Sequence, residues 1–317
     1  MNTLENLLVW SSHRAKTLGR CARQYYYSYI GSWEGWDASA EPEVQMAYRL
    51  KHLTSAELEI GQIVHEQIRV ILAMARSGSV IHPATHIEIA QKKFETFVQC
   101  SATRRLEELS AKRRKLFCHE TGQGFTPQEL ADGMAKIARL LEGFLSFDDV
   151  QLLLAEPARL IPELLDPPGF EVGDELGVPA RPKTDAVFLT DDAVVVSDWK
   201  TGGPREDHRT QGLVYDLFIR KKLNLTSADK VEVRFYYLGE RQVMNHTFSD
   251  DERTEALWLI GEQFGEMRSL SDDPKVNCGP ESRFHPHVSR GCYGCNHRLM
   301  CEPFLASKLA RSTPTAP

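Results

Sequence analysis

Length, composition and the pattern of apolar residues already exclude several classes of protein. The chain has 317 residues, of which 42% are hydrophobic and 26% are charged. These proportions exclude a disordered, collagen-like or disulfide-rich protein. Apolar runs such as 70–75 fall far short of the ~20 residues that a membrane helix needs. The N-terminus lacks the basic start and the cleavage site of a signal peptide, so we expect a cytoplasmic protein with no membrane partner.

The charges and the cysteines narrow the choice further. With 38 Lys and Arg against 44 Asp and Glu, the net charge is −6. This argues against a surface that binds nucleic acid everywhere, although it leaves room for a local basic groove. Seven cysteines cannot all pair as disulfides, and in a reducing compartment few would pair at all. The role of the cysteines must therefore be inferred from their spacing along the chain.

The first half of the chain predicts helices. The first thirty residues indicate a short helix with an aromatic face, and helical periodicity returns at 55–76. Three further helices are expected at 87–100, 101–118 and 127–149. Because this stretch carries no motif of its own after residue 78, we interpret it as a helical insertion.

The second half predicts a sheet. From Ala155 onward, Pro and Gly separate short apolar stretches, as is typical of strands and turns. Residues 183–189 and 193–199 predict a β-hairpin around an acidic turn. A helix, a strand and a further helix are then expected at 208–222, 231–238 and 250–269. The pattern predicts an α/β fold.

An Asp-x-Lys sequence follows an apolar run in the second strand of this hairpin. Side chains alternate along a strand, so Asp198 and Lys200 share one face and Trp199 takes the other. Asp185, on the neighbouring strand, and Asp198 together suit Mg²⁺ or Mn²⁺, and a lysine beside them can activate water for attack on a phosphodiester. The alternative is a solvated hairpin end. The preceding Val-Val-Val favours the functional interpretation, because charge at the end of a buried strand is costly unless it is paired or metal-bound.

Three more polar residues are candidates for the same site. Gln211 and Tyr215 are four residues apart and so share a helix face directly after the Asp-x-Lys strand. Either is also compatible with an ordinary core or surface position. His65 lies in the helix expected at 55–76, where a single histidine is more often structural than a ligand.

The C-terminal cysteines follow a C-x2-C-x5-C pattern. Closely spaced thiols at Cys292, Cys295 and Cys301 indicate ligation of zinc or of an iron–sulfur cluster. The fourth ligand remains open. Cys278 would give a compact zinc site, whereas Cys21 would join the two ends of the chain. Histidines are also available at His285, His287 and His297.

Taken in order, these motifs resemble a known family. The sequence resembles the RecB-type branch of the PD-(D/E)XK nuclease superfamily. The motifs that carry the resemblance are Cys21, Gly61-x3-His65, Asp185, Asp198-x-Lys200, Gln211-x3-Tyr215 and the C-terminal cysteines. More narrowly, the chain is similar to its iron–sulfur members, the AddB nuclease domain and the CRISPR-adaptation exonucleases. The resemblance covers about residues 10–305. It implies a restriction-endonuclease-like mixed sheet flanked by helices, with a helical insertion and an iron–sulfur clasp that joins the N- and C-terminal segments.

The resemblance also implies residue roles. A divalent Mn²⁺ or Mg²⁺ would be held by His65, Asp185, Asp198 and the backbone carbonyl of Trp199. Lys200 would be the catalytic lysine, assisted by the Q-x3-Y pair of Gln211 and Tyr215. A 4Fe-4S cluster would be held by Cys21, Cys292, Cys295 and Cys301, so the choice of Cys21 over Cys278 comes from the resemblance.

We accordingly expect five regions along the chain. They are an N-terminal segment with the first cluster cysteine (1–54), a helical region with the motif histidine (55–150), a nuclease core (151–275), a cluster-binding segment (276–305) and a tail (306–317). Candidate DNA contacts are the basic groups Arg20 and Arg23, Arg104 and Arg105, Lys112–Lys115 and Arg220–Lys222.

The expected function is that of a metal-dependent DNA nuclease. By resemblance, it acts as an exonuclease or endonuclease on single-stranded DNA or DNA ends, in DNA repair, CRISPR adaptation or anti-phage defence. A helicase or another nucleic-acid-processing protein is an expected partner. The alternative is a catalytically weak DNA-binding subunit of a helicase–nuclease or defence complex.

Overall fold

The computed structural model describes residues 5–164, 178–180 and 183–307. These residues separate into two units, each built from several segments of the chain. Unit 1 contains the described residues within 1–55, 98–126 and 262–317, and unit 2 those within 56–97 and 127–261. In the described residues, no helix is long and apolar enough to cross a membrane.

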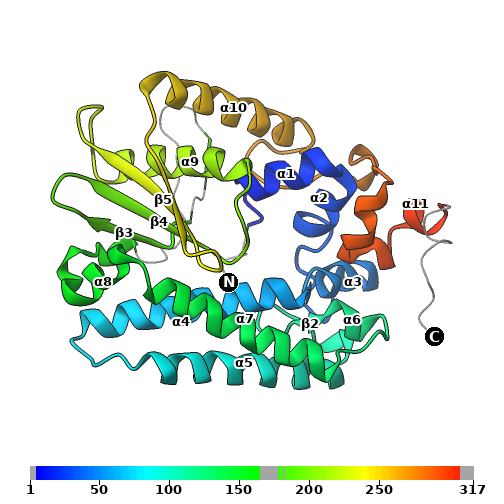
Figure 1. Cartoon of the computed structure of the whole chain (residues 1–317). Coiled ribbons are helices and arrows are strands. Elements are labelled where there is room, and N and C mark those ends of the chain that lie inside the picture. Colours follow the sequence, from blue (N-terminus) through cyan, green and yellow to red (C-terminus); the bar gives the residue numbers. More distant parts are fainter. Residues whose placement is uncertain (1–4, 165–177, 181–182, 308–317) are drawn as a thin grey trace. The chain divides into compact units, whose positions relative to one another are not determined.

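Unit 2 contains a four-stranded mixed sheet (Figure 1). Its strands, in spatial order, are β3 (Ala186–Leu189), β4 (Val194–Lys200), β5 (Val231–Tyr237) and β6 (Gln242–His246). The β3–β4 and β5–β6 pairs are antiparallel, whereas β4 and β5 are parallel. Parallel neighbours need a crossover connection, and α9 (Asp207–Lys222) supplies it. The mixed α/β architecture expected from the sequence is confirmed.

The two faces of this sheet have different neighbours. On one face, α9 packs Tyr215 and Phe218 into a core cluster with Phe235 and Tyr237 of β5. On the other face, Trp199 of β4 packs edge-to-face against Phe144 of α7 (Pro127–Leu145), with ring centroids 5.1 Å apart. Because side chains alternate along β4, the residues on either side of Trp199 point toward the α9 face.

The remaining helices of unit 2 pack around α4 (Ala56–Arg76), which contacts both α7 and α8 (Asp148–Ala155). Its buried side chains recur at helical spacing and include Ile60, Val64 and Ile68. Gly143 allows α7 to approach the end of β5, because a Cβ there would lie 1.9 Å from the Leu238 carbonyl oxygen.

Unit 1 joins the two ends of the described chain. Its helices are α1 (Ser12–Arg20), α2 (Ala22–Tyr29), α3 (Pro42–Leu50), α6 (Phe117–Glu120) and α11 (Glu302–Leu305). Leu7 forms a β-bridge with Val276, and the Asn6 side chain donates to the Asn277 carbonyl at 2.7 Å. A parallel pair, β1 (Leu53–Thr54) and β2 (Lys115–Leu116), brings the middle segment into the unit.

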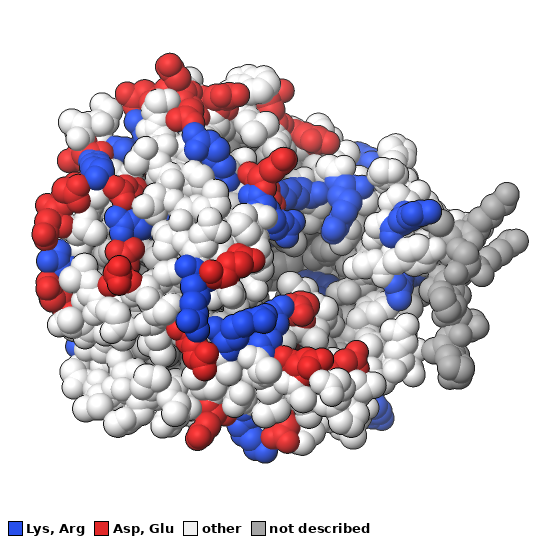
Figure 2. All heavy atoms as spheres, in the orientation of Figure 1, with Lys and Arg blue, Asp and Glu red and all other residues white. Residues whose placement is uncertain are grey.

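Two long helices run along the chain from one unit into the other, namely α5 (Pro83–Thr103) and α10 (Asp250–Ser269). The first turn of α10 contains Asp250, Asp251 and Glu252. Figure 2 shows acidic side chains gathered over this helix. The negative net charge is therefore concentrated in part on one element.

Several helices and strands match the sequence prediction closely. The helices expected at 55–76, 208–222 and 250–269 are α4, α9 and α10, and the strand expected at 231–238 is β5. The hairpin is also confirmed, although β3 begins only at Ala186.

Other expectations were wrong. The helix expected at 101–118 does not form: α5 ends at Thr103, and a 3-10 turn (Leu106–Glu108), β2 and α6 follow. The Ser101 hydroxyl instead accepts a hydrogen bond from the Leu116 amide at 2.8 Å, which fixes a non-helical return. The helix expected at 127–149 is divided between α7 and α8. After Ala155 come the 3-10 turns Pro157–Arg159 and Pro162–Leu164, and the strands expected within 165–177 and 181–182 lie outside the described residues.

Candidate active site and cysteine pocket

Strand register brings two carboxylates together in unit 2. Ala186 pairs with Ser197, so the next pair outward along the hairpin is Asp185 and Asp198. Opposite residues of an antiparallel pair share a face, and both carboxylates line the same cavity. Asp185 Oδ2 also accepts the backbone N–H of Trp199 at 2.8 Å. The hairpin therefore fixes the two acids side by side.

A closed ring of hydrogen bonds orients the second carboxylate. Lys200 Nζ donates to Asp198 Oδ2 at 2.9 Å and to Gln211 Oε1 at 2.8 Å. Gln211 Nε2 donates to the Tyr215 hydroxyl at 2.5 Å, and that hydroxyl donates to Asp198 Oδ2 at 3.0 Å. The ring uses one oxygen of Asp198 and leaves Oδ1 outside it. The sequence-predicted pair Gln211 and Tyr215 thus holds both the carboxylate and the lysine.

His65 reaches the site from α4. Its Nδ1 lies 3.0 Å from Asp185 Oδ1. Burial lowers the pKa of His65, but the charge of Asp185 and the hydrogen bond to it outweigh burial, and the net effect is a raised pKa. The position of His65 agrees with a shared site and not with an isolated structural histidine.

The electrostatics of Asp198 favour a cation in this place. Asp198 is only 4% exposed. Burial and the nearby charge of Asp185 raise its pKa to about 6, although Lys200 acts in the opposite direction. Asp198 is buried beside the partly exposed Asp185, and two adjacent carboxylates repel each other unless a proton or a cation neutralises them. Two carboxylates and an imidazole form a donor set that suits Mg²⁺ or Mn²⁺.

The site opens into a polar cavity of about 370 Å³, which is large enough for a small ligand or a segment of a polymer. The cavity is also lined by Lys183, Arg205 and His208. The sequence reasoning missed His208 and Arg205 as site residues. For His208 a signal was available, because it precedes Gln211 by three residues and so lies on the same helix face.

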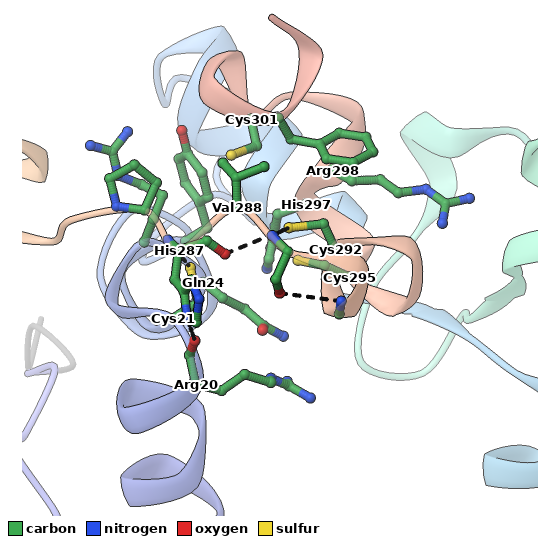
Figure 3. A pocket seen from close by; sticks show the side chains of 16 residues that line it. Arg20, Cys21, Gln24, His287, Val288, Cys292, Cys295, His297, Arg298 and Cys301 are labelled. Atoms are coloured by element: carbon green, nitrogen blue, oxygen red, sulfur yellow. Dashed lines mark hydrogen bonds between the residues drawn. The ribbon is translucent and has the colours of Figure 1, made fainter. Parts of the chain in front are cut away.

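In unit 1, four cysteines line a second and much smaller cavity of about 30 Å³. Cys21 lies in extended backbone between α1 and α2. The other three lie in or beside short turns before α11 and comprise Cys292, Cys295 and Cys301. Figure 3 shows these side chains around the pocket. The fold thus brings the N-terminal cysteine to the C-terminal three.

Cys278 lies outside this group. Its Sγ is 3.3 Å from the Ser271 hydroxyl, and it is absent from the residues that line the cysteine pocket. Of the histidines considered as alternatives, His287 and His297 line the pocket, and His287 directs its backbone N–H to Cys21 Sγ at 3.4 Å.

Two thiols of the pocket, those of Cys295 and Cys301, resist ionisation. Burial raises the pKa of Cys295 to about 11, and charge on the three neighbouring thiols adds to this effect. Burial likewise raises the pKa of Cys301. Cysteine thiols must lose their protons when they bind a metal, so a bound cation would offset the cost of ionising them. In the side-chain positions that the described residues adopt, no three His, Cys, Asp or Glu groups are arranged to hold a metal ion, in either unit.

Some basic residues considered as DNA contacts instead stabilise the fold. Arg23 forms an ion pair with Glu281, and the buried Lys115 pairs with Glu120 at 2.7 Å. The Arg220 guanidinium binds Asp216 at 3.0 Å and the carbonyls of the following turn. Substitution of these residues would therefore disturb folding before it revealed any effect on DNA binding.

Comparison with known protein families assigns the chain to one superfamily. The sequence model of the PD-(D/E)XK nuclease superfamily matches residues 9–302, which is nearly the whole chain. The chain belongs to this superfamily. Its members are generally nucleases that hydrolyse phosphodiesters, typically with divalent ions such as Mg²⁺ or Mn²⁺. No individually curated protein is similar enough to match.

Proposed function

We propose that this protein is a metal-dependent DNA nuclease of the RecB-type, iron–sulfur branch of the superfamily. The observation that carries the proposal is the pair of the partly exposed Asp185 and the buried Asp198, which lie opposite each other beside Lys200 in a polar cavity. The family match over residues 9–302 supports the same chemistry.

In this proposal, the catalytic ion is held by Asp185, Asp198 and His65, with the Trp199 carbonyl as a further ligand. Asp198 would contribute Oδ1, because Oδ2 already accepts hydrogen bonds from Lys200 and Tyr215. An Mn²⁺ or Mg²⁺ ion held by these residues would supply charge stabilisation for the phosphate and a lowered pKa for water.

Lys200 is the residue that positions the attacking water. Its ammonium is oriented by two acceptors, Asp198 Oδ2 and Gln211 Oε1, so the third N–H is left to face a water or a phosphate oxygen. Gln211 and Tyr215 act as positioning residues, because they hold the lysine and the carboxylate through the hydrogen-bond ring.

We propose further that the cysteine pocket holds a 4Fe-4S cluster through Cys21, Cys292, Cys295 and Cys301. The support is that all four line one pocket, although the first is about 270 residues from the others. The cluster would have a structural role, because ligands from distant segments gain folding energy when a metal joins them. A zinc site that uses Cys278 in place of Cys21 would give colourless protein, whereas an iron–sulfur cluster gives brown protein.

The proposed substrates are single-stranded DNA and DNA ends, and a helicase is a proposed partner. DNA repair, CRISPR adaptation and anti-phage defence all employ nucleases of this kind. The support for these assignments is the family resemblance.

A cleavage assay tests the proposal. Anaerobically purified wild type, Asp198→Ala and Lys200→Ala are compared on end-labelled single- and double-stranded DNA with Mn²⁺ or Mg²⁺. Both substitutions should slow cleavage on the order of 10³-fold, because each removes a group that acts in the transition state. Asp191→Ala is the matched control, since that side chain is 92% exposed in the hairpin turn. If wild type binds DNA but cleaves none of it, the alternative of a DNA-binding subunit replaces the nuclease.

A further inference from the structure

His208 is a polar residue of the cavity wall to which the proposed function gives no role. It lies on α9 with Gln211 and Tyr215, at positions i, i+3 and i+7, which form one face of a helix. All three line the cavity that contains Asp198 and Lys200. The polar face of α9 therefore extends beyond the Q-x3-Y pair by one further residue.

The imidazole of His208 is held in a defined orientation. Its Nδ1 lies 2.8 Å from the hydroxyl of Tyr237, and its ring stacks on Tyr237 and on Phe235 at centroid distances of 5.6 Å. On the other side, Nε2 lies 3.9 Å from Asp207 Oδ1. A histidine oriented in this way through one ring nitrogen matches the arrangement of a general acid or base.

The strand register places this histidine next to the catalytic lysine. Tyr237 of β5 is the register partner of Lys200 in β4, and both side chains point toward α9. Charged and titratable groups near His208 include Asp207 on its own helix and Tyr237 on β5, and Lys200 and Arg205 line the same cavity. Tyr237 therefore lies level with Lys200, at the end of β4 opposite to Val194, and His208 contacts it there.

Three hydrogen donors of the cavity already serve the two carboxylates. Lys200 and Tyr215 donate to Asp198, and His65 is paired with Asp185. Hydrolysis of a phosphodiester requires a proton for the oxygen that leaves, and a positioned acid accelerates this step by ~10²–10⁴-fold. The residues so far assigned a role provide the ion site and the water but no such acid.

We propose that His208 is a further catalytic residue, the general acid that protonates the leaving oxygen. The oxygen of water forms a bond to phosphorus, and its proton passes to solvent. The bond from phosphorus to the leaving oxygen breaks, its electron pair stays on that oxygen, and Nε2–H of His208 supplies the proton. The imidazole regains a proton from solvent. This inference rests on the proposed nuclease activity.

A substrate with a sulfur leaving group tests the proposal. Product end groups first establish which bridging oxygen leaves, and a second oligonucleotide then carries sulfur at that position. A thiolate leaves without a proton, because thiols ionise near pH ~8.5. His208→Gln should slow cleavage of the oxygen substrate ~100-fold and leave cleavage of the sulfur substrate close to the wild-type rate. Lys200→Ala should be slow on both.

Two further variants make the test specific. His246→Gln is the matched control, because His246 also packs on Phe235, at 5.6 Å, but lies outside the cavity lining. It should cleave both substrates at the wild-type rate. Tyr237→Phe keeps the ring and removes the hydroxyl that holds Nδ1, so it should be ~10-fold slower on the oxygen substrate only.

Three outcomes overturn the inference. An equal loss on both substrates would mean that His208 acts before the leaving group departs, by binding or packing. No loss in His208→Gln would remove the residue from the mechanism. Absence of cleavage by wild type would instead contradict the nuclease proposal itself, and the inference would fall with it. Thermal unfolding of each variant, measured in parallel, shows that the comparison is between folded proteins.

Discussion

The carboxylate site of unit 2 and the cysteine pocket of unit 1 are assembled in opposite ways. Apart from His65, the polar side chains of the carboxylate site come from residues 183–215, which include the hairpin and the following helix. The cysteine pocket combines Cys21 with a segment near the other end of the chain. A local register builds the first site, whereas only the complete fold of unit 1 builds the second.

The two sites also differ in what holds them without a metal ion. The Asp198 carboxylate is bound by Lys200 and Tyr215 in a closed hydrogen-bond ring. The thiols of the pocket instead receive backbone N–H groups, such as that of Ser289 at 3.5 Å from Cys292 Sγ. Loss of the divalent ion should therefore abolish catalysis at the carboxylate site but leave that site folded. Loss of the proposed cluster should instead unfold the cysteine pocket.

The largest effect is expected at the carboxylate site. Asp185→Asn should lower DNA cleavage on the order of 10³-fold, about 4 kcal/mol in activation free energy, because it removes a ligand charge. The same change should leave the melting temperature unchanged or higher, since it relieves repulsion on the buried Asp198. Cleavage rates and thermal unfolding of the metal-free protein check both parts. A large fall in melting temperature would contradict the view that this site is held by its own hydrogen bonds.

In the cysteine pocket, the effect should fall on folding. If the proposed cluster is bound, Cys295→Ser should remove the iron and lower the stability of unit 1 by about 3 kcal/mol or more, because a cluster that joins distant segments contributes folding energy. Iron content, visible absorption and hydrogen exchange in α1 and α2 give the measurement. Cys278→Ser is the matched control and should retain iron, as its side chain lies outside the pocket. Iron loss in the Cys278 variant alone would favour the alternative ligand set.

These differences explain how much of each site the sequence could predict. Alternation along 194–200 places Asp198 and Lys200 on one face, and the i, i+4 spacing adds Gln211 and Tyr215 to a common helix face. Both rules are local, and the observed hydrogen bonds agree with them. Spacing alone left the fourth ligand open between Cys278 and Cys21, because the approach of α1 and α2 to the C-terminal turns is a long-range property.

The elements that the sequence failed to predict have weak local signals. Strand β6 is an edge strand in which Gln242 and Val243 are exposed, so it lacks the alternation of a half-buried strand. Helix α3 begins with Pro42, which suits the first helical position but also resembles loop punctuation. At 101–118, the helical pattern was overruled by the pairing of β2 with β1. In each case, tertiary contacts determined the outcome.

A fall in pH should change the stability of the two units in opposite directions. Burial, then Lys51 and Arg114, lower the pKa of His52 in unit 1 to about 4. The stability that this histidine supports is present above its unfolded pKa of ~6.5 and is lost as the pH falls toward 4, by about 2 kcal/mol. Asp198 in unit 2 has a raised pKa of about 6, so its unfavourable charge is removed over the same range.

Hydrogen exchange at pH 6.5 and pH 4.5, on protein free of divalent ions, measures this contrast. Protection should fall in α3 and should hold or rise in β4. His52→Gln should flatten the response of α3 and leave that of β4 as it is. A parallel loss of protection in both elements would show that the pH effect is global and unrelated to these two groups.

The smallest effect is expected from a single hydroxyl of the ring. Tyr215→Phe keeps the buried ring and removes the hydrogen bond to Asp198 Oδ2, so cleavage should fall ~10-fold, about 1.4 kcal/mol. The apparent affinity for manganese should change little, because Oδ1 remains available. Steady-state cleavage rates over a manganese titration separate these two quantities. A variant that is restored to the wild-type rate by excess manganese would assign Tyr215 to ion binding instead.

Manganese binding tests the central claim most directly. Titration of wild type, Asp198→Asn and Lys200→Ala by calorimetry, without DNA, measures whether the paired carboxylates hold the ion. The account predicts saturable binding by wild type, binding weakened by ~10-fold or more in Asp198→Asn, and binding equal or tighter in Lys200→Ala, where a competing positive charge is gone. Equal affinity in wild type and Asp198→Asn would contradict it, because the ion would then be held elsewhere or not by these carboxylates.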